Sequence, residues 1–113
     1  MANRTVSKKA LPSPLKEILR QVGQNLKIAR KRRGMTQKEL AHRIFCSIPT
    51  IKRLEEGDAG VSLNVLIQAL WIFGLQEQLR ALASPGTDDT GMQFEIQRLP
   101  KTVRKPGKTD MDF

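Results

Sequence analysis

The stretch TQKELAHRIFCSIPTIKRLEEG, residues 36–57, contains two short helix signals separated by a turn. Thr36 and Glu39 form a T-x-x-E capping box, which predicts the start of one helix. After the turn at residues 45–46, Ser47 is suited to cap a second helix that ends at Gly57. The spacing therefore predicts two helices of about eight residues separated by about three.

The apolar residues of this stretch are spaced so that the two helices can pack against each other. Ala41 is small and lies where the two helices must approach closely. The remaining contacts are expected from Leu40, Ile44, Ile51 and Leu54. Together with the capping signals, this pattern predicts a helix-turn-helix unit.

Three more helices are predicted around this unit. The first has an amphipathic stripe that starts after Pro14 and ends near Arg33, and Gly23 within it predicts a break or a new start. Another begins after Ser62 and ends at Gly74. The last carries leucines at 75, 79 and 82 and ends at the Ser-Pro-Gly of residues 84–86. The predicted fold class is an all-α bundle of five helices.

The 113 residues support a single folded domain with extensions at both ends. We expect a flexible basic arm at 1–14, the helical domain at 15–84 and a partly disordered extension at 85–113. In this extension, MQFEIQR at 92–98 alternates apolar and polar residues and predicts a short strand. The tail after Pro100 has no core-forming pattern and is expected to order only on a partner.

Composition argues against several classes of protein. There is no apolar run of membrane-spanning length and no secretory leader pattern at the start. The one cysteine, Cys46, permits no internal disulfide and suggests a reducing, cytoplasmic setting. With one histidine, His42, the chain has no usual zinc ligand set. No nucleophile–base pair or glycine-rich phosphate loop is present, so we expect neither an enzyme nor a cofactor.

Positive charge is concentrated at the start of the chain. The net charge is +9, and residues 15–34 contain seven Lys or Arg against Glu17 alone. The arm adds Arg4, Lys8 and Lys9. A basic pole of this kind favours a polyanionic partner, and nucleic acid is the first candidate. The alternative is a solvated helix end at which cations complement the helix dipole.

The motifs also resemble a known family. IARKRRGMTQKELAHRI followed by SIPTIKRLEEGDAGVSLNVLIQAL resembles the Xre-type, lambda-repressor-like helix-turn-helix family over residues 22–82. More narrowly, GDAGVSLNVLIQALWIFGL and RLPKTVRK resemble HipB-type antitoxins. The resemblance implies a lambda-repressor-like bundle that binds the inverted repeat of an operator in double-stranded DNA. It further implies a HipA-like kinase toxin as partner, and repression of its own operon.

The resemblance also implies roles for individual residues. Gln37 would bind a phosphate and brace the recognition helix, which is the second helix of the motif. Ser47 would cap the recognition helix close to the DNA backbone. Arg30 and Glu55 occupy the positions of a salt bridge between the first helix and the end of the recognition helix. The candidates for contacts to base edges are Ile48, Pro49, Thr50 and Arg53.

Physical chemistry supports a DNA role for the same helix. A helix fits the major groove, and its first turns reach base edges. Arg53 can bind guanine O6 and N7 together, although pairing with Glu56 is the alternative. Lys52 lies off that face and suits a phosphate or solvent about equally well. Further phosphate contacts are expected from the cations Lys27, Arg32, Arg33 and Arg43.

The loop GDAGVSL that follows the recognition helix has no cation, unlike its counterpart in many phage repressors. Phosphate contacts there would have to come from backbone amides and polar side chains. The candidates are the amides of Ala59, Gly60 and Val61 and the side chains of Ser62 and Asn64.

The helix that follows this loop has more apolar residues than one buried stripe needs. The surplus predicts a homodimer with two recognition helices about one DNA turn apart, although the same residues could instead close the monomer's core. The expected interface residues are Trp71, Ile72, Phe73, Leu75, Leu79 and Leu82.

Two function classes therefore stay open. One is a sequence-specific repressor, either an autoregulating antitoxin or a phage-type repressor without a toxin. The other is an interaction protein that mainly holds a HipA-like toxin, with DNA binding secondary.

Two residues of the turn and helix are unusual. Pro49 follows the Ser47 cap closely, where the helix leaves its N–H unpaired, so proline is tolerated there. Phe45 stands where a tight turn favours glycine. It is strained if its φ is positive, and its ring is expected to pack on the preceding helix or on a partner.

Overall fold

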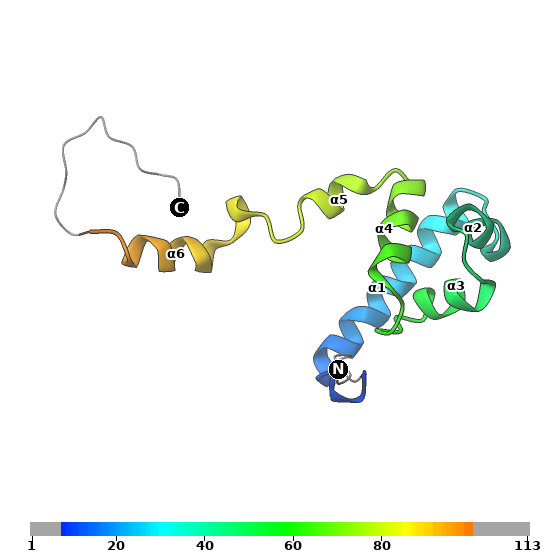
Figure 1. Ribbon diagram of the computed structural model, residues 1–113, viewed down its shortest axis with the longest axis horizontal. Coiled ribbons are helices and arrows are strands. Elements are labelled where there is room, and N and C mark those ends of the chain that lie inside the picture. Colours follow the sequence, from blue (N-terminus) through cyan, green and yellow to red (C-terminus); the bar gives the residue numbers. More distant parts are fainter. Residues whose placement is uncertain (1–7, 101–113) are drawn as a thin grey trace, which may run out of the picture. The chain divides into compact units, whose positions relative to one another are not determined.

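The computed structural model describes residues 8–100, and these residues form helices and turns with no strand. The chain divides into two compact units, Met1–Arg80 and Ala81–Phe113. The first unit contains α1 (Ser13–Arg32), α2 (Gln37–Ile44), α3 (Ile48–Glu55), α4 (Leu63–Ile72) and α5 (Gln76–Arg80), preceded by the 3-10 turn η1 (Lys8–Ala10). The second unit contains the 3-10 turn η2 (Pro85–Thr87) and α6 (Asp89–Gln97). The predicted all-α class and the helix-turn-helix unit are confirmed (Figure 1).

The first helix is continuous, so the break predicted at Gly23 is wrong. Gly23 is buried in α1 because the end of α3 packs against it. A Cβ atom at this position would lie 2.5 Å from the Glu55 carbonyl oxygen and 2.7 Å from the Gly57 nitrogen. Glycine therefore permits the close approach of α1 to the end of α3, and this packing offsets the low helix propensity of glycine.

The predicted caps of α2, α3 and α4 are present. In the capping box of α2, the Glu39 amide donates to Thr36 Oγ1 at 3.0 Å and the Thr36 amide donates to Glu39 Oε1 at 2.7 Å. The backbone bond from Thr36 holds the pKa of the Glu39 carboxyl below its usual value. At α3 the Thr50 amide donates to Ser47 Oγ at 3.2 Å, and at α4 the Val65 amide donates to Ser62 Oγ at 3.3 Å. These side chains satisfy amides that the helix starts leave unpaired.

The core lies where α3 packs on α1 and α2, and where α4 packs on α2 (Figure 1). Leu40 and Ile51 are fully buried at its centre. The other buried apolar side chains are Leu26, Ala41, Ile44, Leu54, Val65, Ala69 and Phe73. The core therefore fixes α3 from its inner face and leaves its outer face to solvent.

Phe73 was expected at a dimer interface, and the structure shows that this is wrong. Its side chain is only 4% exposed and belongs to the core. Arg33 closes this end of the domain by donating from Nε and Nη2 to the Phe73 carbonyl oxygen, at 3.1 and 2.8 Å. The Arg33 guanidinium also lies 5.3 Å from the centre of the Phe73 ring, within range of a cation–π interaction.

In the second unit, the strand predicted at residues 92–98 is wrong, because this segment lies in α6 and its C-cap. Asp88 caps the helix by accepting a 2.9 Å hydrogen bond from the Gly91 amide. Alternation of apolar residues indicates a strand when one face is buried, but Met92, Phe94 and Ile96 are all exposed here. The local cap therefore prevails over the alternating pattern. The fifth predicted helix also ends earlier than expected, at Arg80.

Candidate nucleic-acid interface

Helix α3, the second helix of the helix-turn-helix unit, is held by a buried ion pair. Arg30 on α1 donates to Glu55 on α3 through Nε at 2.7 Å and Nη2 at 3.1 Å. Only 7% of the Arg30 side chain and 3% of the Glu55 side chain are exposed. Arg30 Nη1 also donates to the Met35 carbonyl oxygen at 2.8 Å, which joins α1 to the turn before α2. The predicted salt bridge is confirmed, and it ties three segments of the domain together.

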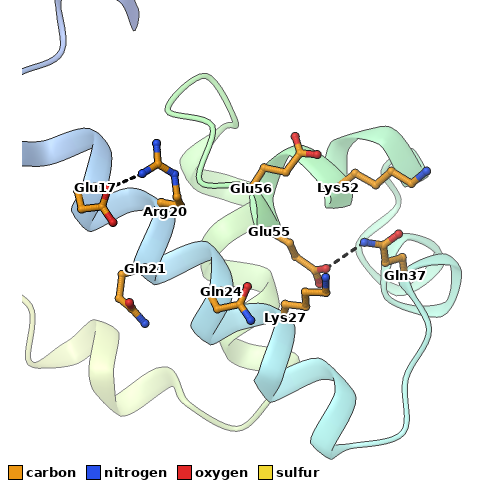
Figure 2. A pocket seen from close by; sticks show the side chains of 9 residues that line it. All are labelled: Glu17, Arg20, Gln21, Gln24, Lys27, Gln37, Lys52, Glu55 and Glu56. Carbon is orange, nitrogen blue, oxygen red and sulfur yellow. Dashed lines mark hydrogen bonds and ion pairs between the residues drawn. The ribbon is translucent and has the colours of Figure 1, made fainter. Parts of the chain in front are cut away.

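Gln37 completes this network from the first turn of α2. Its Nε2 donates to Glu55 Oε1 at 3.0 Å (Figure 2). The predicted bracing of α3 by Gln37 is therefore confirmed, while its phosphate contact stays a prediction. One amide proton is used by Glu55, and Gln37 carries a second one that this contact does not use.

A hollow of about 680 Å³ lies beside this network. Gln37 and Glu55 form one part of its wall, and Lys27 from α1 and Lys52 from α3 also line it (Figure 2). Its remaining lining residues are Glu17, Arg20, Gln21, Gln24 and Glu56. Because Glu17 pairs with Arg20, two of these charges are already matched. Lys27, predicted to contact phosphate, and Lys52, for which phosphate and solvent were both open, thus lie along one concave surface next to α3.

The outer face of α3 carries a short chain of polar contacts. The hydroxyls of Ser47 and Thr50 lie 2.8 Å apart, and Arg53 Nη2 donates to Thr50 Oγ1 at 3.3 Å. No ion pair joins Arg53 to Glu56 within residues 8–100, so the alternative partner for Arg53 is not used. The three side chains are therefore ordered on one exposed face before any partner binds.

Apolar residues stand at the start of the same helix. Ile48 is 37% exposed and Pro49 is exposed, as a base-facing surface requires. Phe45, in the turn, has φ 64° and ψ 46°, which is the left-handed conformation. Its side chain is 92% exposed, so the prediction that it packs on α2 is wrong.

Several cations expected at phosphate are already engaged within the domain. Arg33 is bound to the Phe73 carbonyl and, through Nη1, to the Ala29 carbonyl at 2.8 Å. Lys8 donates to Asp58 Oδ1 at 3.0 Å, and sequence reasoning missed this contact between the arm and the loop. Arg43 stays exposed, and its side chain contacts the Met35 sulfur at 3.7 Å. Arg4 lies outside the described residues, as does the side chain of Lys9.

The loop after α3 uses polar groups for its own structure. The Gly60 amide donates to Asp58 Oδ1 at 2.7 Å, and the Val61 amide donates to the Asp58 carbonyl at 3.3 Å. These bonds correct the expectation that both amides are free for phosphate. The hydrogen bond from the Gly60 amide, and to a smaller extent the one from Lys8, holds the pKa of the Asp58 carboxyl below its usual value.

The comparison with protein families agrees with this geometry. Residues 21–83, more than half of the chain, match the helix-turn-helix domain family. The chain belongs to this family. No curated protein and no solved structure matches the chain. The matched range of the helix-turn-helix domain contains α2, α3 and the Arg30–Glu55 pair that supports them.

Between residues 8 and 100, no cluster of three or more His, Cys, Asp or Glu side chains is arranged to hold a metal ion. Over the same residues, no helix has the length and apolarity needed to span a membrane. The candidate site of this helix-turn-helix domain is the outer face of α3 with the adjoining hollow, because the ordered polar side chains and the lysines of the hollow lie there.

Proposed function

We propose that this helix-turn-helix protein is a sequence-specific transcriptional repressor that binds an inverted-repeat operator as a dimer. The observation that carries the proposal is the ordered face of Ser47, Thr50 and Arg53 on α3. A base-reading helix must be held rigidly, and the buried Arg30–Glu55 pair holds this one from behind. We further propose that the protein is the DNA-binding antitoxin of a type II toxin–antitoxin module and has no enzymatic activity.

The chemistry of the face suits the major groove. Arg53 presents a guanidinium that can donate to both O6 and N7 of guanine. Thr50 offers a hydroxyl to a base or phosphate and a methyl group to thymine. Ile48 and Pro49 are exposed at the start of α3 and supply apolar contacts beside these polar ones.

Phosphate contacts fix the orientation of the recognition helix. The second amide proton of Gln37, at the start of α2, can donate to a phosphate oxygen while the first braces Glu55. Lys27 and Lys52 supply positive charge along the hollow on the same side. Arg43 adds an exposed cation at the end of α2. This distribution lets backbone contacts set the register in which Arg53 meets the bases.

Exposed apolar side chains support dimer formation. Trp71 on α4 is 67% exposed, which is unusual for a large aromatic residue. Ile72 and Leu75 are only partly buried against the core, and Leu79 is partly exposed on α5. Leu82 is exposed and belongs to the second unit. We expect the self-complementary surface to be centred on Trp71. Replacing Trp71 by Glu should therefore convert a sedimenting dimer to monomer.

The antitoxin role is supported by the resemblance of residues 57–75 and 98–105 to HipB-type proteins. This resemblance implies a HipA-like kinase toxin as the protein partner and a cytoplasmic, nucleoid-associated location. The alternatives are an antitoxin that mainly binds the toxin, and a phage-type repressor without one.

The test begins with a duplex selected by the wild-type protein from a random DNA pool. Arg53→Ala combined with Gln37→Ala should abolish binding to this duplex. The same double variant should still co-purify with a kinase-like protein encoded by the neighbouring reading frame. Arg80→Ala is the control, because Arg80 is an exposed arginine on α5 paired with Glu77. Failure of the wild-type protein to select any sequence would refute the repressor, and loss of both activities together would refute separate surfaces for DNA and toxin.

A further inference from the structure

The structure assigns a role to Phe45: we propose that its ring is a specificity-determining contact that packs on thymine methyl groups in the major groove of the operator. This inference rests on the proposed function and adds a residue of the turn to the recognition surface. It is carried by the backbone conformation of Phe45, by the exposure of its ring and by its neighbours.

The backbone of Phe45 is strained. At φ 64° it occupies the left-handed region, where the Cβ atom of an L-residue crowds the following carbonyl oxygen. At three other helix ends of the same unit, a glycine supplies the positive φ without this cost: Gly34, Gly57 and Gly74. The turn itself is well formed, since the Cys46 amide donates to the Ala41 carbonyl at 3.0 Å. Glycine would make the same turn with less strain, so the phenylalanine needs another explanation.

Packing inside the chain does not offset this strain. The Phe45 side chain is 92% exposed, which is more than any other large apolar residue among those described. Two features of Phe45 are therefore unfavourable for the free protein: the strain of its backbone and the exposure of its apolar ring to water. A contact made only with a partner accounts for both features.

The place of Phe45 in the chain indicates which partner the ring contacts. Phe45 lies two residues before the Ser47 cap, and the exposed Ile48 and Pro49 follow it at the start of α3. The nearest exposed cation in sequence is Arg43, and the exposed Lys52 and Arg53 follow on α3, so the local charge favours a polyanion over a neutral or basic protein surface. The thymine methyl is the apolar group that base edges present in the major groove. With Ile48 and Pro49, Phe45 would thus supply the apolar contacts to thymines, beside the guanine contact proposed for Arg53.

The proposal predicts opposite effects on stability and on binding. Phe45→Gly should raise the thermal midpoint by roughly 4–8 °C, because it removes the strain and no buried contact. The same variant should bind the selected duplex about tenfold more weakly. Phe45→Tyr is the matched control, since it keeps the ring and the strain and should retain both wild-type values.

Replacing individual thymines of the duplex by uracil removes single methyl groups and tests the contact directly. The wild-type protein should lose affinity at one or more thymines in each half-site, and Phe45→Gly should be insensitive at those positions. If Phe45→Gly gains stability but binds the duplex as tightly as wild type, the ring contacts no DNA and the inference is refuted. If Phe45→Gly loses toxin co-purification and keeps DNA affinity, the partner of the ring is protein instead. If the wild-type protein selects no duplex, the proposed function is refuted together with this inference.

Discussion

Replacement of Glu55 by alanine should be the most damaging single change at the recognition helix. Glu55 accepts two hydrogen bonds from Arg30 and one from Gln37, and it is almost fully buried. Within the described residues, its loss leaves the buried Arg30 guanidinium with the Met35 carbonyl as its one remaining partner. Removing one member of a buried ion pair costs about 3–5 kcal/mol. A domain of this size has a total stability of only about 5–15 kcal/mol.

Thermal and denaturant unfolding followed by circular dichroism measures this loss. We expect the midpoint of Glu55→Ala to fall by about 12 °C or more, given about 4–8 °C per kcal/mol for a domain of 60–100 residues. Glu56→Ala is the matched control, because Glu56 is the exposed neighbour and should change stability by no more than about 0.5 kcal/mol. Arg30→Met combined with Glu55→Leu removes both charges and should recover most of the loss. If Glu55→Ala loses no more stability than Glu56→Ala, the ion pair does not hold α3.

Three further predictions concern the packing of α1, the loop after α3 and the contacts to phosphate. Gly23→Ala should lower the unfolding midpoint although alanine favours helices, because its Cβ would meet the Glu55 carbonyl at 2.5 Å; an unchanged midpoint would contradict this packing. The lowered pKa of Asp58 stabilises the fold at pH values above the ordinary aspartate pKa, so the stability of wild type relative to Asp58→Asn should fall as the pH drops below about 4. A stability difference that does not change with pH would contradict this contribution of Asp58. Lys52→Ala should weaken binding to selected and scrambled duplexes alike, and it should reduce the slope of log affinity against log salt by about one; a loss confined to the selected duplex would make Lys52 a base contact.

Local signals were sufficient to predict the helix-turn-helix unit. The capping box at Thr36, the cap at Ser47 and the stop near Gly57 each depend on a few neighbouring residues, and the structure contains all three. The Arg30–Glu55 pair was predicted from the family resemblance instead, because its members lie 25 residues apart and no local sequence signal relates them. The residues on the exposed face of α3 could be predicted from helical periodicity once the start of the helix was known.

Features that depend on tertiary packing could not be predicted in the same way. Gly23 was expected to weaken α1, but the close approach of α3 makes glycine necessary at that position. Phe73 was assigned to a surface because one apolar run contains both buried and exposed residues, and only the fold distinguishes them. Arg33 was counted among free cations, yet the Phe73 carbonyl lies within its reach. Alternation at residues 92–98 indicated a strand, but residues 8–100 contain no strand that could pair with it, and the Asp88 cap starts a helix.

The central claim is that the exposed face of α3 reads bases through Arg53. The most direct measurement is the dissociation constant of wild type and Arg53→Ala on a series of duplexes in which each base pair of the selected site is changed in turn. The wild-type protein should discriminate against replacement of one guanine per half-site by about tenfold or more. Arg53→Ala should lose this discrimination at that guanine alone, and Arg80→Ala should retain it. If Arg53→Ala keeps the full discrimination of the wild-type protein at every position, Arg53 does not read a base and the assignment of α3 is contradicted.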